Sequence, residues 1–289
     1  MPQSPILPHK AFGVDSARSY APPADAASTV SESIARLSGD PNFMTTLARG
    51  LAVIQAFSQR KRQVTVSQLS AKTGLSRAAV RRCLYTLQKL GFAGSSDSRH
   101  FFLLPRILTL GCSCISSIPL GAVLQPVIER LSHQLHESCS LATLDGANVI
   151  YIAHAPFTRM MSTDLGVGSR LPAFCTSTGR VLLAHLPENE LASFLAGIHL
   201  QRMTDRTIVT AEKLRPALQL ARQNGYCIVD QEFELGFRSI AVPVRNAFGK
   251  VLAALNVGAP AQRVTVQHMQ AEFLPALRAA AAELDRLFS

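Results

Sequence analysis

The chain has 289 residues, of which 47% are hydrophobic, and it carries a formal net charge of +10. This length predicts about two domains with sizeable cores. The excess charge belongs to one segment: Met44 to Arg106 contain eleven Lys or Arg residues and one acid, Asp97, whereas the rest holds 18 bases and 18 acids. A basic domain joined to a neutral one predicts a polyanion partner for the first domain only.

Composition and spacing argue against several other classes of protein. The six cysteines include no C-x-x-C pair, which favours reduced cytosolic thiols over a zinc or redox site. Residues 1–43 are rich in Pro, Ser and Ala and lack the apolar segment of a signal peptide, so we expect a disordered arm and a cytoplasmic protein. The uncharged residues 107–128 are divided by Pro119, which favours packed helices over a membrane span.

The basic segment, residues 44–106, shows three helical patterns in succession. The second pattern has Ser67 as its candidate N-cap and stops at Gly74, and the third has Ser76 as its N-cap and stops before Gly91. Apolar spacing places Leu47, Ala48, Leu51, Ala52 and Ile54 on one face of the first helix. In the third helix the apolar set is Val80, Leu84, Leu87 and Leu90.

Two short strands around the polar turn at 95–98 follow the third helix, which completes the pattern of a winged helix-turn-helix. The outer face of the third helix carries several bases and no acid. A helix fits the DNA major groove, where arginine bonds guanine. We therefore predict double-stranded operator DNA as a partner, and the alternative is a solvated basic helix. The predicted contact residues are Arg49, Ser76, Arg77, Ala78, Arg81, Arg82, Tyr85, Arg99 and His100.

After Arg106 the sequence changes to strands mixed with helices. A linker helix is expected over 107–118, followed by a helix over 120–138 and a hairpin with its turn at Asp145-Gly146. Further strands are expected at 226–230, 239–244 and 250–258, before a C-terminal helix over 265–288. Mostly antiparallel strands with helices predict an α+β fold, with residues 119–289 forming an effector domain of GAF or PAS type.

Three long stretches resemble the IclR family of bacterial transcriptional regulators: "TTLARGLAVIQAF", "GLSRAAVRRCLYTLQKLGF" and "GYCIVDQEFELGFRSIAVPV". The resemblance is greatest to the Pca/Pob branch, which controls aromatic-acid catabolism. It implies a homodimer or a dimer of dimers, a small carboxylate effector, and contact with RNA polymerase if the protein is an activator. It also implies an effector cavity lined by the residues at Met161, Leu165, Ser177, Thr178, Asp230 and Ser239.

Residue chemistry points to the same segment as the effector site. Thr176, Ser177 and Thr178 stand at an expected helix start, where free N–H groups and the helix dipole favour an anion such as a carboxylate. The resemblance to the Pca/Pob branch implies protocatechuate, 4-hydroxybenzoate and β-ketoadipate as candidate effectors. Arg159 and Arg170 are candidate carboxylate partners, and His154 is a candidate partner for a phenolic hydroxyl. The alternatives are ordinary helix capping, surface arginines and a core histidine.

Two other classes of function remain as alternatives. The first is a small-molecule enzyme with a DNA-binding appendage, although the chain lacks the G-x-S-x-G, H-E-x-x-H, P-loop and G-x-G-x-x-G motifs; Cys175 and His154 are its only candidate nucleophile pair. The second is a constitutive DNA-binding protein without a ligand. His133 and His136 have helical metal spacing, but we predict no metal and no cofactor.

Overall fold

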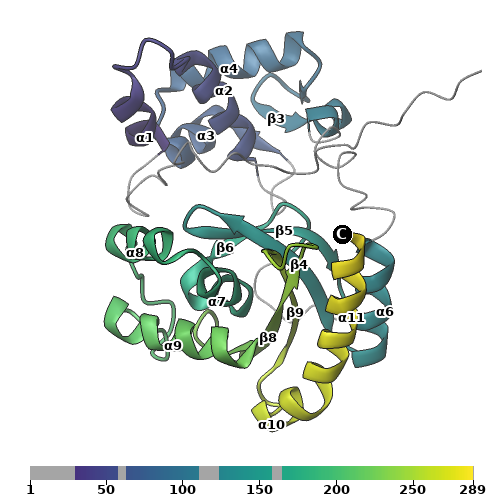
Figure 1. The fold of residues 1–289 in the computed structure, drawn as a ribbon. Coiled ribbons are helices and arrows are strands. Elements are labelled where there is room, and N and C mark those ends of the chain that lie inside the picture. Colours follow the sequence, from purple (N-terminus) through teal and green to yellow (C-terminus); the bar gives the residue numbers. More distant parts are fainter. Residues whose placement is uncertain (1–29, 58–62, 111–123, 158–164, 289) are drawn as a thin grey trace, which may run out of the picture.

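The computed structural model describes residues 30–57, 63–110, 124–157 and 165–288, and the structural statements below concern these residues. They form an N-terminal domain of helices with a small sheet and a C-terminal domain built on a larger antiparallel sheet (Figure 1). This order confirms the expected α+β class, with a winged helix-turn-helix followed by an antiparallel-sheet domain.

The N-terminal domain begins with a helix that the sequence analysis did not predict. The helix α1 (Val30–Leu37) lies within the expected disordered arm, so that expectation is wrong for these residues, while residues 1–29 lie outside the described part. The helix buries Ile34 and contacts α2 (Thr45–Gln55). Its apolar residues recur at helical spacing, a signal hidden by the surrounding Pro/Ser/Ala-rich composition.

The first helix of the helix-turn-helix, α3 (Val66–Thr73), begins two residues earlier than expected. Thr65, and not Ser67, is the N-cap: its hydroxyl accepts the N–H of Gln68, whose side chain accepts the Thr65 N–H at 3.0 Å. This capping box fixes the helix start because it satisfies two free N–H groups at once. At the other end Gly74 adopts φ +73°, which a side chain would disfavour.

The second helix, α4 (Arg77–Lys89), begins and ends as the sequence predicts. Ser76 caps it by accepting the N–H of Ala79, and Gly91 adopts φ +75° just after its last turn. The strands β2 (Ala93–Ser95) and β3 (His100–Leu103) then form the wing. A third strand, β1 (Val64–Thr65), pairs with β3, so the sheet order is β1-β3-β2.

The core of this domain differs from the expected one at two helices. The helix α4 buries Val80, Leu84 and Leu87 as predicted, but Leu90 is 51% exposed. In α2 Ala52 is buried as predicted and Val53 is buried as well, whereas Leu47 and Leu51 lie on the exposed side. The helix α2 is apolar on more than one side, so spacing alone did not decide which side packs against α3 and α4. The predicted buried set was therefore wrong at Leu47, Leu51 and Leu90.

The connection between the domains is described only in part. A 3₁₀ turn, η1 (Pro105–Leu108), follows the wing, and the next described helix is α6 (Gln125–Leu135). Of the linker helix expected over 107–118, residues 107 and 108 lie in η1 and residues 109 and 110 begin a helix. The rest of it and the start of the helix expected at 120–138 fall on residues 111–123, outside the described residues. None of the helices in the described part of the chain is long and apolar enough to span a membrane.

The C-terminal domain is built on a six-stranded sheet in which every pair of neighbours is antiparallel. Its spatial order is β6-β5-β4-β9-β8-β7. The predicted hairpin is confirmed, because Asp145 pairs with Asn148 and Gly146 adopts φ +61°. The strands are β4 (Ser138–Asp145), β5 (Asn148–Ala155), β6 (Arg170–Pro172), β7 (Cys227–Asp230), β8 (Phe237–Arg245) and β9 (Val251–Pro260).

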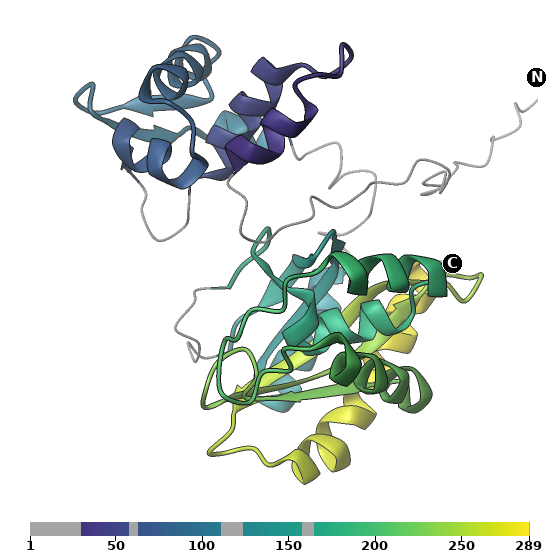
Figure 2. The same ribbon diagram turned by 90° about the vertical axis from the view of Figure 1, so that its left-hand side faces the viewer.

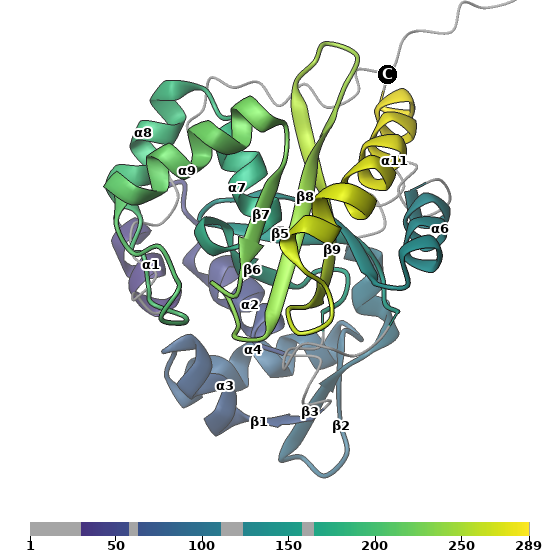
Figure 3. The same ribbon diagram turned by 90° about the horizontal axis from the view of Figure 1, so that it is seen from below.

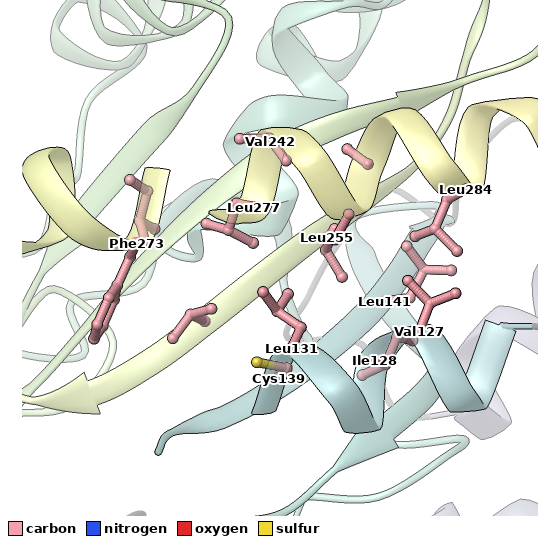
Figure 4. Packing of buried hydrophobic residues seen from close by; sticks show 14 of the residues in the cluster. Val127, Ile128, Leu131, Cys139, Leu141, Val242, Leu255, Phe273, Leu277 and Leu284 are labelled. Carbon is pink, nitrogen blue, oxygen red and sulfur yellow. The ribbon is translucent and has the colours of Figure 1, made fainter. Parts of the chain in front are cut away.

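Helices cover both faces of this sheet, as Figures 2 and 3 show. One face packs against α7 (Ser177–Ala184), with α8 (Glu188–Gly197) and α9 (Ala211–Asn224) beyond it. The other face packs against α6 and α11 (Leu274–Leu287), which follows the short α10 (Val266–His268) and a π-helical turn, η4 (Met269–Phe273). Each face has its own core cluster, and Figure 4 shows Leu277 and Leu284 of α11 above Leu255 of β9.

Candidate functional site

The outer face of α4 presents the basic side chains that the sequence placed there. Arg77, Arg81 and Arg82 are exposed, opposite the buried apolar side of the helix, and Ala78 between them is small and exposed. Tyr85 is 62% exposed on the same side, with the Lys89 ammonium 5.4 Å from its ring centroid. The helix therefore offers a positive surface with one aromatic ring, which suits phosphates and base edges.

The structure brings Arg49 of α2 close to this face. Burial raises the pKa of the Cys83 thiol on α4, and the charges of Arg49 and Arg82 oppose that increase. The positive charges of two arginines from different helices, Arg49 and Arg82, therefore both reach Cys83 on α4. Cation density of this kind strengthens attraction to a polyanion.

The wing tip contains the single acid of the basic segment. Asp97 accepts the Nδ1–H of His100 at 2.7 Å and the backbone N–H groups of His100 and Arg99. These hydrogen bonds, the His100 side chain first, lower the pKa of Asp97 to about 2. The wing thus uses its own carboxylate to order the turn and leaves Arg99 exposed beside it.

The start of α7 has the features of an anion site. Thr176 is the N-cap: its hydroxyl accepts the Gly179 N–H at 3.2 Å and donates to the carbonyl of Pro172 at 3.0 Å, so ordinary capping accounts for this residue. Ser177 and Thr178 are 1% and 0% exposed. The Ser177 hydroxyl has no hydrogen-bond partner among the described residues, and the Thr178 hydroxyl has only the Tyr151 hydroxyl nearby. A buried hydroxyl without a partner costs about 1–3 kcal/mol, so a bound ligand is a natural partner.

A row of polar residues crosses the sheet on the face that α7 covers. Ser140 of β4 pairs with His154 of β5 on one side and with Asn256 of β9 on the other. The Ser140 hydroxyl is 2.8 Å from His154 Nδ1, and the Asn256 side-chain oxygen is buried without a partner in the described residues. Ser239 of β8 is buried on the same face, two residues from Ala241, which pairs with Asn256.

Sequence reasoning missed Asn256, whose only signal was one polar residue in the apolar strand "VLAALNVGAP". The buried Tyr151 of β5 was missed as well. Burial raises its pKa to about 12, and the nearby Thr178 hydroxyl opposes this increase. Tyr151 therefore keeps its proton at neutral pH and lies close to the start of α7.

Asp230, a predicted effector residue, is not brought together with these groups. Its neighbour Val229 belongs to the cluster under α7, and successive side chains of a strand point to opposite faces, so Asp230 points to the other side. Its carboxylate is bound by Arg206 at 2.9 Å and by Arg238 at 2.8 Å. Arg238 thus pairs with Asp230, while Arg180 pairs with Glu232.

The other predicted effector residues have mixed placements. Leu165 packs against the cluster under α7. Arg170 lies at the sheet edge in an exposed ion pair with Asp145 at 2.7 Å, as the surface-arginine alternative expected. Arg159 and Met161 lie outside the described residues.

The candidate nucleophile pair of the enzyme alternative shows no activation. Burial, opposed by Arg180, raises the pKa of the Cys175 thiol to about 12, and His154 Nδ1 is engaged by Ser140. Across residues 30–57, 63–110, 124–157 and 165–288, no group of three His, Cys, Asp or Glu side chains is arranged to hold a metal ion. The His136 ring instead lies beside that of Phe157, with centroids 5.2 Å apart and the ring planes tilted by 58°.

Comparison with known proteins places the chain in a family. Residues 46–96 match the IclR helix-turn-helix domain, and residues 112–286 match the C-terminal domain of the bacterial transcriptional regulator IclR. The chain is 52% identical over 252 residues, or 87% of its length, to the Pca regulon regulatory protein of Pseudomonas putida, of which 86% is covered. The chain belongs to the IclR family.

Two further relatives inform its function. The p-hydroxybenzoate hydroxylase transcriptional activator of Acinetobacter baylyi is 36% identical over 251 residues, covering 85% of this chain and 92% of that protein. The crystal structure of an IclR homologue from Microbacterium hydrocarbonoxydans, complexed with 4-hydroxybenzoate, is 26% identical with a TM-score of 0.72. That match covers 84% of this chain and 98% of the homologue. This IclR-family chain thus resembles a transcriptional activator in sequence and a 4-hydroxybenzoate-bound IclR homologue in fold.

Proposed function

We propose that this IclR-family protein is a cytoplasmic, ligand-responsive regulator of aromatic-acid catabolic genes, without enzymatic activity. Its effector is a small aromatic acid whose carboxylate binds at the start of α7. The observation that carries the proposal is the buried start of α7, where the Ser177 hydroxyl has no partner among the described residues and the Thr178 hydroxyl has only the Tyr151 hydroxyl nearby. The relatives named for the Pca regulon and for p-hydroxybenzoate hydroxylase, and the homologue with bound 4-hydroxybenzoate, support the choice of an aromatic acid.

The chemistry of the site suits a hydroxylated aromatic carboxylate. The first N–H groups of α7 have no partners within the helix, and together with the helix dipole they favour an anion. The Ser177 and Thr178 hydroxyls provide two further hydrogen-bond donors for the oxygen atoms of the bound carboxylate. The row of His154, Ser140 and Asn256 under α7 offers donors and acceptors for a ring hydroxyl. Recognition of this kind needs no unpaired arginine.

A near-isosteric double substitution tests the site. Replacing Ser177 by Ala and Thr178 by Val removes both hydroxyls without filling space. The ligand-free protein should be about as stable as wild type, because Ser177→Ala removes a buried hydroxyl that has no partner among the described residues. Its affinity for 4-hydroxybenzoate or protocatechuate, measured by calorimetric titration, should fall by about tenfold or more. Ser193→Ala on exposed α8 is the matched control and should bind as wild type.

Each result of this test has a clear meaning. Acid binding that is unchanged in the double variant would remove the carboxylate from the start of α7. A wild-type protein that shows no stabilisation with any aromatic or dicarboxylic acid would favour the constitutive DNA-binding alternative. Conversion of the acid to a product would favour the enzyme alternative.

We further propose that α4 and the wing bind operator DNA through the residues predicted from the sequence. A symmetric operator requires two copies of the DNA-binding domain. The exposed side of α2 offers a surface for the second copy. Met44, Leu47 and Leu51 are 69%, 56% and 47% exposed and recur at helical spacing, which makes an apolar stripe. A second copy of the chain covers this stripe in the homodimer. The effector changes operator affinity or, in an activator, contact with RNA polymerase.

If the stripe is an interface, placing charge on it should separate the two copies. Sedimentation velocity should show a smaller species for Leu47→Glu than for wild type at equal concentration. Leu220→Glu, which alters a residue 56% exposed on α9, is the control and should leave the assembly unchanged. Identical sedimentation of Leu47→Glu and wild type would exclude α2 from the interface.

A further inference from the structure

A buried ion pair lies one turn beyond the proposed carboxylate site. Arg180 of α7 donates Nη1–H to Glu232 Oε1 at 2.6 Å and Nη2–H to Oε2 at 2.5 Å. The two side chains are 4% and 11% exposed. Removing two charges from water is costly, and apolar replacements of similar volume are often as stable or more stable. Stability alone therefore gives no reason for charged residues here.

The remaining polar groups of the pair connect three chain segments. Arg180 Nε–H donates to the carbonyl of Phe174 at 2.8 Å, in the turn that precedes α7. Glu232 Oε2 accepts the N–H of Ile208 at 3.0 Å, and the Glu232 carbonyl accepts the Thr207 hydroxyl at 2.6 Å. The first turn of α7 is thus joined by directional bonds to the turn before it and to the loop before α9.

The chain at Glu232 is also strained. Gln231, which is not glycine, adopts φ +61°. Its carbonyl accepts the Thr204 hydroxyl at 2.7 Å, and its N–H donates to the carbonyl of Phe237 at 2.9 Å. Such a conformation persists only where several contacts hold it, and it occurs preferentially beside functional sites.

We propose that Arg180 and Glu232 are positioning residues for the effector. They fix the rotation of α7 about its own axis, so that the Ser177 and Thr178 hydroxyls face the bound carboxylate. Apolar packing restrains such a rotation weakly, because it is not directional, whereas a bidentate pair has a defined geometry. Glu232 also neutralises Arg180, so the anion preference comes from the helix start and the hydroxyls. The proposal rests on the proposed effector site.

Replacing both residues of the pair by apolar ones tests whether the pair positions α7 for the acid or only stabilises the fold. In the full-length double variant Arg180→Met with Glu232→Leu, the thermal midpoint should fall only moderately. Apolar replacement of the ion pair itself costs little, but the Phe174 carbonyl and the Ile208 N–H lose a partner. The probes are 4-hydroxybenzoate and its neutral analogue 4-hydroxybenzamide. Wild type should prefer the acid, since a hydrogen bond to a charged group is stronger than one to a neutral group. In the double variant affinity for the acid should fall by about tenfold, and preference over the amide should be largely lost.

The controls make each result decisive. Arg215→Met with Glu188→Leu removes an ion pair between α9 and α8, whose side chains are 39% and 72% exposed, and should keep the acid preference. If the Arg180 variant proves unstable, Arg180→Lys keeps the charge without the fork, and it should lower acid affinity more than amide affinity. A folded variant that keeps the wild-type acid preference overturns the positioning role while the Ser177 and Thr178 test still stands. Equal weakening of acid and amide overturns it too.

Discussion

Gly179→Ala should disturb the proposed effector site through the backbone. Gly179 lies in the first turn of α7, between the hydroxyls of Ser177 and Thr178 and the buried Arg180. A Cβ atom built there would lie 2.1 Å from the carbonyl oxygen of Ala173 and 2.3 Å from its Cα. Both atoms belong to the backbone, so no side-chain rotation relieves the clash. The helix itself must move away from the preceding turn.

The size of the effect follows from this geometry. Ordinary van der Waals contact begins at 3.4 Å, so α7 must move by about 1.3 Å. Overpacking typically costs ~1–3 kcal/mol, and we expect the upper part of this range because only backbone can yield. Replacing a helical glycine by alanine regains about 0.5–1 kcal/mol. The net destabilisation should be about 2 kcal/mol, and the movement should also weaken binding of the acid.

Denaturant unfolding and calorimetric titration with 4-hydroxybenzoate measure the two effects. Gly197→Ala is the matched control, since Gly197 ends α8 and nothing lies within 4 Å of its added Cβ. It should be neutral or stabilising by about 0.4–1 kcal/mol. The reasoning would be refuted by a Gly179→Ala protein that has wild-type stability and wild-type affinity for the acid.

Two further predictions concern DNA binding and pH. Arg81→Ala should weaken binding to a selected operator by ~1–3 kcal/mol in a mobility-shift assay, whereas the control Arg215→Ala should bind as wild type. The logarithm of the wild-type affinity should fall with the logarithm of the salt concentration, with a slope of roughly 0.9 per neutralised phosphate. Equal affinities of Arg81→Ala and wild type, or an affinity independent of salt, would contradict the assignment of α4. Burial, opposed by Arg263, raises the pKa of Glu137 from 4.5 to about 6, so the folded state binds more protons than the unfolded state between these values. Stability should therefore fall as pH rises from 4.5 to about 6, and thermal midpoints of Glu137→Gln should lack this slope; parallel pH profiles would show that Glu137 is not its source.

Local signals predicted most of the elements, and they failed where a signal had two interpretations. Ser76 and Gly91 mark the ends of α4 because a side-chain oxygen and a left-handed glycine act within one turn of the chain. Leu47 and Leu51 of α2 have helical spacing, yet they are exposed, since several sides of this helix are apolar. Spacing defines a face, and only the neighbouring helices decide whether it is covered.

The features of the candidate sites likewise fall into those set by local sequence and those set by tertiary contacts. Sequence by itself determined the basic helix α4, the helix start at Ser177 and Thr178, and the family to which the chain belongs, because charge, capping and extended motifs are written in consecutive residues. Tertiary structure decided that Asn256 lies beside Ser140, that Asp230 points to the other face, and that Arg180 meets Glu232. These depend on strand register and on contacts between residues up to 116 positions apart. A shift of one residue in register would reverse the face of each strand residue, and no local pattern specifies that choice.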